Sequence, residues 1–416
     1  MENTNVSSTE YEESEHEETE HEEPGKSPTH AKHARAIDLK PQKRIEGLDI
    51  ARGFALLGMI TVHLIPWDVE IGVSVFHDLF SGRAAALFAL LAGISLALIT
   101  GGSTPHTGKR LRQDRVAVAT RGLILLIFGL ALNSLTPGDI SILPYYGVFF
   151  LVGSLLIGLH TRTLAVLTGI LIVAGPAVVH MALWVEGFDS VRSSTLPEFF
   201  TSPLNTVFSL LFIGFYPAAT WITFVACGIA LGRIDVQDLA VQIKLMFFGG
   251  LTAVCSALVS EVIVYHFGVL DRIIETTPWA YSDIMFALDY GGETVPGYSW
   301  WWLMVDNPHN NTPFFLLDAG GSAVFMVGFS LLAARVLAKE LSPIAAAGSM
   351  TFTLYTAHLL ALKIDHTELQ IMWVCINIVV AIAVAHFWKK RIGQGPLERL
   401  ISLASKSVAR VVVPKT

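Results

Sequence analysis

Four ionisable side chains, Arg52, His63, His77 and Arg83, lie within or at the edge of two strongly apolar segments early in the chain. A charge at membrane depth is costly unless it faces a cavity or a partner, so such groups are functional candidates. An imidazole can carry protons near neutral pH, and a guanidinium can stabilise a developing negative charge. We therefore look for acid–base chemistry in this hairpin.

The helical spacing of these side chains indicates how deep in the membrane each one lies. Positions eleven apart nearly superimpose on a helix, so Arg52 and His63 share one face, separated by roughly 16 Å along the axis. Asp49 precedes Arg52 by three residues, which places an acid beside the base at one end. On the second helix a face of small residues is expected to pack closely against a neighbour; it consists of Gly82, Ala86, Ala89, Gly93 and Ala97.

His77 and Asp78 lie just before the second helix, at the end opposite Arg52. An imidazole with a carboxylate nearby can act as a general base. The alternative is a pair of histidines, His63 and His77, that are only solvated or hydrogen-bonded at the ends of their helices. Further polar groups are expected at the same level, near the starts and ends of other apolar segments: His309, Asp318, His358, Tyr355 and Tyr146.

The composition identifies a membrane protein. Of 416 residues, 52% are hydrophobic and 15% charged, and apolar runs of about 18 or more residues recur, each long enough to cross the bilayer as a helix. Because lipid leaves only helices or closed barrels as spanning structures, continuous runs indicate an all-α polytopic protein. We predict about ten spans, near 47–66, 79–100, 118–136, 143–160, 163–185, 207–232, 243–268, 314–336, 343–363 and 370–388.

Charge patterning indicates the domain organisation and the orientation. Residues 2–23 hold ten glutamates and no apolar face, so 1–43 is predicted to be an acidic disordered cytoplasmic tail with no cleavable signal peptide. Residues 44–400 form the membrane domain, and 401–416 a short basic cytoplasmic tail. The basic clusters fall on one side of a ten-span arrangement, which places both termini in the cytoplasm.

The segment 101–117, together with the start of the next span, is the strongest basic cluster, with Lys109, Arg110, Arg112, Arg115 and Arg121. Such a cluster is able to hold the phosphates of an anionic substrate, although topology alone also explains a basic cytoplasmic loop. On the opposite side, the aromatic and acidic loop 269–313 is either an interfacial aromatic belt or a platform for a sugar or lipid head group.

Several other chemistries are disfavoured by missing motifs. The histidines show no HxxxH spacing and the three cysteines, all in predicted spans, show no CxxC pairing, so no metal site is predicted. There is no GxxxxGK phosphate loop and no GxSxG elbow, which argues against an ATPase and a serine hydrolase. Membrane lipids, and no nucleic acid, are the expected macromolecular surroundings.

The order of the apolar motifs resembles the transmembrane acyltransferases related to heparan-α-glucosaminide N-acetyltransferase and their bacterial members. The resemblance covers most of residues 44–400 but not the acidic tail, and it rests on RIEGLDIARGFALLGMITVH, His77 followed by Gly82, LFALLAGISLAL, ILPYYGVFFLVG, FYPAATWITFVACGIALGR, NPHNNTPFFLLDAGGSAVFMVG, GSMTFTLYTAHLLAL and GPLERL.

The resemblance implies transfer of an acetyl group from cytoplasmic acetyl-CoA to a hydroxyl or amine of a glycan or glycolipid on the outer face of a plasma membrane. It maps the family's catalytic histidine onto His77, with Asp78 beside it. His63 stands where the lysosomal enzyme has an Asn, and Phe80 where the family has a Trp. Arg83 or His63 would stabilise the oxyanion.

The remaining roles follow from this scheme. Arg52 and the five basic residues from Lys109 to Arg121 are expected to bind acetyl-CoA, whose arm would pass between the first two helices. His309, His358, Tyr355 and Tyr146 are expected to bind the acceptor. A transporter or flippase for a lipid-linked sugar is the main alternative, because intramembrane Arg and His groups suit it equally well. A scaffold that recruits partners through the acidic tail is a third.

Overall fold

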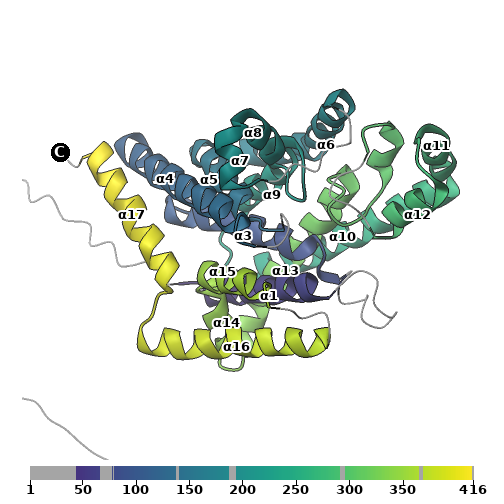
Figure 1. The fold of residues 1–416 in the computed structure, drawn as a ribbon. Helices are drawn as coiled ribbons and strands as arrows, with labels where there is room; N and C mark the ends of the chain where they lie inside the picture. The colour runs from purple at the N-terminus through teal and green to yellow at the C-terminus, as the bar shows by residue number, and fades with distance from the viewer. Residues whose placement is uncertain are drawn as a thin grey trace, which may run out of the picture. The chain divides into compact units, whose positions relative to one another are not determined.

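A computed structural model describes residues 44–65, 77, 79–136, 140–186, 194–290, 296–364 and 369–414, and in these ranges the only regular elements are helices. The described residues from 45 onwards pack as one compact unit, whose helices are drawn in Figure 1. The prediction of an all-α membrane protein is confirmed. The predicted acidic tail, residues 1–43, and Asp78 lie outside the described residues.

Within the described ranges, six helices are long and apolar enough to cross a membrane: α1 (Glu46–Leu64), α4 (Gly108–Asn133), α6 (Thr161–Glu186), α10 (Leu239–His266), α13 (Pro313–Val336) and α16 (Gln370–Arg391). The shorter helices are α3 (Arg83–Ile99), α5 (Leu143–Leu156), α7 (Leu196–Thr201), α8 (Pro203–Phe212), α9 (Ala218–Leu231), α11 (Val269–Thr276), α12 (Tyr281–Tyr290), α14 (Ser342–Gly348), α15 (Thr351–Ala361) and α17 (Pro396–Val412), with a 3₁₀ turn, η1 (Trp300–Met304).

Two of the predicted spans are interrupted. The segment predicted at 207–232 contains α8 and α9, separated by residues that include Gly214 at φ +86° and Pro217. The segment predicted at 343–363 is the pair α14 and α15, which meet at a bend of 80°. Proline and a left-handed glycine both end helical hydrogen bonding, which explains the first break. The number of ten spans stays a prediction.

The small-residue face predicted on the second helix is confirmed in its inner half. A Cβ on Gly93 of α3 would overlap the carbonyl oxygen of Val225 in α9, and a Cβ on Gly228 would overlap the carbonyl oxygen of Leu90. Glycines at these positions let the two backbones approach each other closely, as small residues do in membrane helix pairs. The outer end differs, because a Cβ on Gly82 would meet Phe315 of α13.

Helix α1 lies at the centre of the unit, where it contacts α3, α13, α14, α15 and α16 (Figure 1). Its backbone passes so close to α14 that a Cβ on Gly348 would overlap the carbonyl oxygen of Asp49. Apart from Arg52 and His63, the side chains of α1 are mostly buried apolar groups. This position brings both ends of its charged face against several other helices.

The C-terminal segment is a helix. α17 packs on α4, and Gln113 Nε2 donates to the carbonyl oxygen of Val413 at 2.7 Å. Glu398, in the first turn of α17, accepts hydrogen bonds from the backbone N–H of Thr353 at 3.0 Å and from its hydroxyl at 2.6 Å. The domain boundary predicted at residue 400 therefore falls inside a packed helix that also caps the start of α15.

Candidate active site

Three side chains from three helices form a hydrogen-bonded chain at one end of α1. His63 Nδ1 lies 3.2 Å from His358 Nε2 of α15, and the two rings are stacked with an interplanar angle of 5°. His358 Nδ1 lies 3.3 Å from Asn377 Oδ1 of α16. The Tyr355 ring, one turn before His358, lies 6.1 Å from the His63 ring between centroids.

The hydrogen bonds of Asn377 decide where the protons lie. Its Nδ2 donates to the carbonyl oxygen of Trp373 at 3.0 Å, so Oδ1 is the acceptor and His358 Nδ1 must donate. In the neutral ring His358 Nε2 then accepts from His63 Nδ1–H, and the lone pair of neutral His63 is on Nε2. The chain thus orients His63 as a proton acceptor, in the way a third residue orients the base of a catalytic triad.

His309 lies in the loop before α13, within electrostatic range of both His63 and His77. Its ring is enclosed by aromatic side chains of Phe215, Tyr216 and Trp221, and its Nδ1 donates to the carbonyl oxygen of Phe215 at 3.3 Å. Burial, aided by the charge of His77 and opposed by the hydrogen bond to Phe215, lowers the pKa of His309 to about 4. His309 is therefore neutral at pH 7, with its lone pair on Nε2.

The backbone of this loop is strained, because His309 and Asn311 adopt φ values of +63° and +57°. Such angles are costly for residues other than glycine and persist only where the surroundings hold them. Hydrogen bonds of the Asn311 side chain keep the loop in this conformation. Its Oδ1 accepts from Trp221 Nε1 at 2.6 Å and from the Thr220 hydroxyl at 3.1 Å. Its Nδ2 donates to the carbonyl oxygen of His309 at 2.7 Å.

An ion pair joins the start of α3 to α13 beside this loop. Arg83 Nε and Nη2 both contact Asp318 Oδ2, at 2.9 and 2.7 Å, and Ser322 also hydrogen-bonds the Asp318 carboxylate. Asp306 lies within electrostatic range of this pair, and its Oδ2 is buried without a hydrogen-bond partner among the described residues. Burial, followed by the charge of Asp318, raises the pKa of Asp306 to about 7, although Arg83 opposes the shift.

Asp306 should therefore make the protein less stable as the pH rises. Its pKa is about 7 in the fold, against 3.8 for an unperturbed aspartate, so between these values the folded state holds a proton that the unfolded state has lost. The stability falls across this window and stays low above pH 7. Asp306→Asn removes the effect: the melting temperature in detergent, variant minus native, should rise from pH 5 to 7 and then level off. A difference independent of pH would contradict the assignment.

The other end of the α1 face is also built as expected. Arg52 Nη1 contacts Asp49 Oδ1 at 2.6 Å, and Arg52 Nη2 donates to the Ser95 hydroxyl of α3 at 2.7 Å. Arg121 of α4 lies within electrostatic range of Arg52, and its guanidinium carbon lies 5.3 Å from the centre of the Phe150 ring. Arg121 Nε is buried and has no hydrogen-bond partner among the described residues.

A cavity of about 100 Å³ lies beside Arg121. It is lined by Arg121 of α4, Tyr146 of α5, Tyr355 of α15, Met59 of α1 and Ile401 of α17. The cavity therefore borders both the guanidinium of Arg121 and the Tyr355 ring, whose centre lies 6.1 Å from that of His63. Its volume holds a segment of an extended chain and not a whole coenzyme.

The catalytic-domain model of the heparan-alpha-glucosaminide N-acetyltransferase family matches residues 44–260. The chain belongs to this family. A search of curated proteins found no match. Membership makes the protein a membrane acetyltransferase. The matched region runs from α1 into α10 and includes His63, His77, Arg83 and Arg121, whereas His309 and His358 lie beyond it.

The structure of this acetyltransferase brings the predicted acyl-transfer residues into two groups. His63, His77, His309 and His358 lie near one another, while Arg52, Arg121 and Tyr146 lie near one another at the other end. Tyr146, predicted to bind the acceptor, is thus grouped with Arg121. Arg83 lies beside the histidine group through its bond to Asp318.

The basic residues of α4 differ in how far their side chains are buried. Lys109, Arg110 and Arg112 are exposed at the start of the helix, whereas Arg115 and Arg121 are partly buried. The described residues contain no group of three or more His, Cys, Asp or Glu side chains placed to hold a metal ion. The cavity beside Arg121 is lined by residues of α1 and α3, among them Met59 and Phe88, as well as by residues of α4, α5 and α15. The expected passage of the acetyl-CoA arm between the first two helices stays a prediction.

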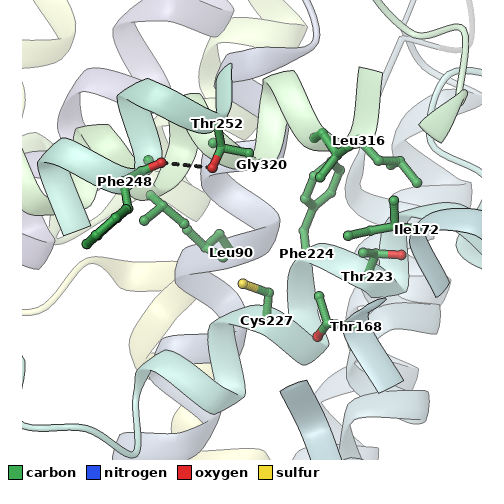
Figure 2. A pocket seen from close by; sticks show the side chains of 14 residues that line it. Leu90, Thr168, Ile172, Thr223, Phe224, Cys227, Phe248, Thr252, Leu316 and Gly320 are labelled. Carbon is green, nitrogen blue, oxygen red and sulfur yellow. Dashed lines mark hydrogen bonds between the residues drawn. The ribbon is translucent and has the colours of Figure 1, made fainter. Parts of the chain in front are cut away.

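A second cavity of about 210 Å³ has a different character. Figure 2 shows its lining of apolar side chains with threonines and Cys227, and the Thr252 hydroxyl is engaged with the carbonyl oxygen of Phe248 at 2.8 Å. None of its lining residues is ionisable except the Cys227 thiol. It offers the acetyltransferase no acid, base or cation at which acyl transfer would occur.

Sequence reasoning missed Asn377 and Asp306. Asn377 is a lone amide on an apolar helix, and a polar residue at membrane depth is the signal that would have found it. Asp306 stands three residues before His309 in a loop already marked as aromatic and acidic. Its burial beside Arg83 and Asp318, and not its spacing, makes it unusual.

Proposed function

We propose that the protein transfers an acetyl group from cytoplasmic acetyl-CoA to a hydroxyl or amine of a glycan or glycolipid at the outer face of the plasma membrane. The termini are placed in the cytoplasm in this proposal. The observation that carries it is the cavity lined by Arg121 and by Tyr355, the neighbour of His63, because a thioester must reach the acceptor without the coenzyme crossing the membrane.

The donor end is supplied by cations. A buried guanidinium nitrogen without a partner is rare in proteins and calls for an anion or water that satisfies it. Arg121 offers such a group at the end of the cavity. Arg115 Nε, about one and a half turns earlier on α4, is also buried and has no hydrogen-bond partner among the described residues. The exposed Lys109, Arg110 and Arg112 would attract the coenzyme phosphates to the start of α4.

The transfer step needs a base near the thioester carbon. In the proposal His77 removes the proton as the acceptor oxygen or nitrogen attacks the carbonyl, the C–S bond breaks, and the leaving thiolate takes up a proton. Alternatively His77 accepts the acetyl group itself and passes it on. His63, with its lone pair on Nε2, is suited to accept a proton in this step.

Arg83 is then the group placed to stabilise the oxyanion. Both of its contacts to Asp318 fix the plane of the guanidinium, and a fixed donor stabilises a developing charge without reorganising during the reaction. The hydrogen-bonded chain from Asn377 leaves His63 oriented as an acceptor, so the oxyanion role expected for either residue falls to Arg83.

Arg121→Gln tests the donor end. With the protein in lipid nanodiscs, we expect the KM for acetyl-CoA to rise about tenfold or more while the KM for the acceptor changes little, because one charge-assisted contact is lost. Arg162→Gln, at an exposed arginine that begins α6, is the matched control and should behave like the native protein. An unchanged KM in Arg121→Gln, or transport of a sugar without consumption of thioester, would contradict the proposal.

A further inference from the structure

A large apolar groove, separate from the second cavity, lies beside α3. Its volume is about 540 Å³, within the range of about 300–1,000 Å³ that small-molecule sites occupy. Helices α1, α3, α10 and α13 form its walls. The walls are mostly apolar, with Phe54, Phe80, Leu87, Val254, Phe325 and Met326.

The groove opens towards the surroundings of the helices. Leu79 and Val254, which line it, are 56% and 57% exposed, and α10 is a candidate span of which only 28% of the most apolar window is buried. An exposed apolar surface on a membrane-spanning helix faces hydrocarbon. A chain in the bilayer can therefore enter the groove from the side.

Two polar side chains also line the groove, Arg83 and Ser322, and both contact Asp318. A charged group in an apolar, lipid-facing groove is expensive, and such groups mark binding sites or substrate paths. Phe80 and Arg83 follow His77 by three and six residues. The polar part of the groove is therefore the part next to the candidate base.

We propose that this groove holds the hydrocarbon chain of a lipid-linked acceptor, with the hydroxyl-bearing head group beside Arg83. The inference rests on the proposed function and narrows its acceptor to a lipid. Lipid tails are as apolar as the groove wall, so the groove adds orientation more than affinity. It holds the head group where His77 and Arg83 can act on it.

The second cavity provides a contrast with bulk lipid. Both spaces are largely apolar and lie between membrane helices, but only the groove contains an ion pair. Ordinary phospholipid chains have no reason to prefer the costly charged groove to the uncharged cavity. A lipid with a hydroxylated head group gains hydrogen bonds from Arg83, and so it selects the groove.

Two glycines give matched occlusion variants. A Cβ on Gly250 in the groove would lie 3.3 Å from the ring edge of Phe325, and a Cβ on Gly320 in the second cavity would lie 3.3 Å from the ring edge of Phe224. Both glycines are inside helices, where leucine has the better helix propensity. Gly250→Leu adds to the groove the same side chain that Gly320→Leu adds to the second cavity.

The probe is an alkyl glucoside with a photoreactive diazirine near the end of a dodecyl chain, in nanodiscs of phosphatidylcholine. After irradiation, peptide mapping should place the label in native protein on α10 near Val254 and on α13 near Phe325. We expect labelling to fall at least fivefold in Gly250→Leu and to stay within twofold in Gly320→Leu. Unlabelled dodecyl glucoside should compete, and the phosphatidylcholine matrix should not.

Three results would overturn the proposal. The first is equal labelling of the two variants, and the second is labelling in proportion to the exposed surface of each helix, concentrated on α16. The third is equal labelling of the groove by a diazirine phosphatidylcholine. The last result identifies bulk lipid as the occupant. The distribution of label in native protein decides the matter even if Gly250→Leu fails to fold. Groove labelling without acetyl transfer would refute the proposed function alone, whereas acetyl transfer without groove labelling would refute this inference alone.

Discussion

Replacing His77 by Ala is expected to lower acetyl transfer by about two to four orders of magnitude, the usual contribution of a positioned acid–base group. His77 is buried, six residues before α3 begins. It lies within electrostatic range of His309 and inside the segment that matches the acetyltransferase family. The loss should appear in kcat, because the proton moves only in the transition state. Turnover is measured as free thiol released from acetyl-CoA together with acetylated product.

Two variants make this result specific. His77→Gln keeps a hydrogen-bonding side chain of similar size and should be as inactive as His77→Ala, since an amide is no base. His266→Ala removes an exposed histidine at the end of α10 and should leave turnover unchanged. Near-native turnover in His77→Gln with intact folding would refute the catalytic assignment of His77.

The second large effect is expected at Asn377, whose side chain orients His358. In Asn377→Leu the His358 ring loses the acceptor of its Nδ1–H, so the tautomers of His358 and His63 are no longer fixed. We expect kcat to fall about 10- to 100-fold, as when residues that orient a histidine are removed. The KM for acetyl-CoA should change less than twofold, and the pH dependence of kcat should shift.

Asn377→Asp distinguishes positioning from packing. The carboxylate keeps an oxygen acceptor for His358 Nδ1–H, so a good part of kcat should return, whereas a structural role would leave both variants equally impaired. A pH profile that is the same in native protein, Asn377→Leu and Asn377→Asp would show that Asn377 does not control the protonation of His63.

Local patterns in the sequence correctly predict features that depend on the residue spacing within a single helix. The spacing of Asp49 and Arg52 predicts their ion pair, which forms at 2.6 Å, and the small residues on the second helix predict the close α3–α9 contact at Gly93. Each feature depends on neighbours along one helix, and helical periodicity determines those directly. The burial of Arg121 and the exposure of Arg112 on the same helix follow from its contacts with α5 and α17 and are not visible in the sequence.

Contacts between distant helices cannot be predicted in this way. His63 and His358 are 295 residues apart in the sequence. Hydropathy indicates that both side chains face the protein interior, but it does not indicate which other helix each one contacts. The breaks at residues 213–217 and 349–350 escape prediction for a related reason, because the apolar run continues through them. The packing of α17 on α4 is likewise not visible in the sequence, since the charges of this helix hide the face that makes the contact.

The central claim is that acetyl groups enter from the side that carries the start of α4 and leave on the other. Radiolabelled acetyl-CoA, which does not cross membranes, can be added to sealed inverted vesicles and to right-side-out vesicles from cells that express the protein. We predict labelled glycan or lipid product only in inverted vesicles, inside the lumen, and none with His77→Gln. Equal labelling in both kinds of vesicle, or equal labelling with His77→Gln, would contradict the account.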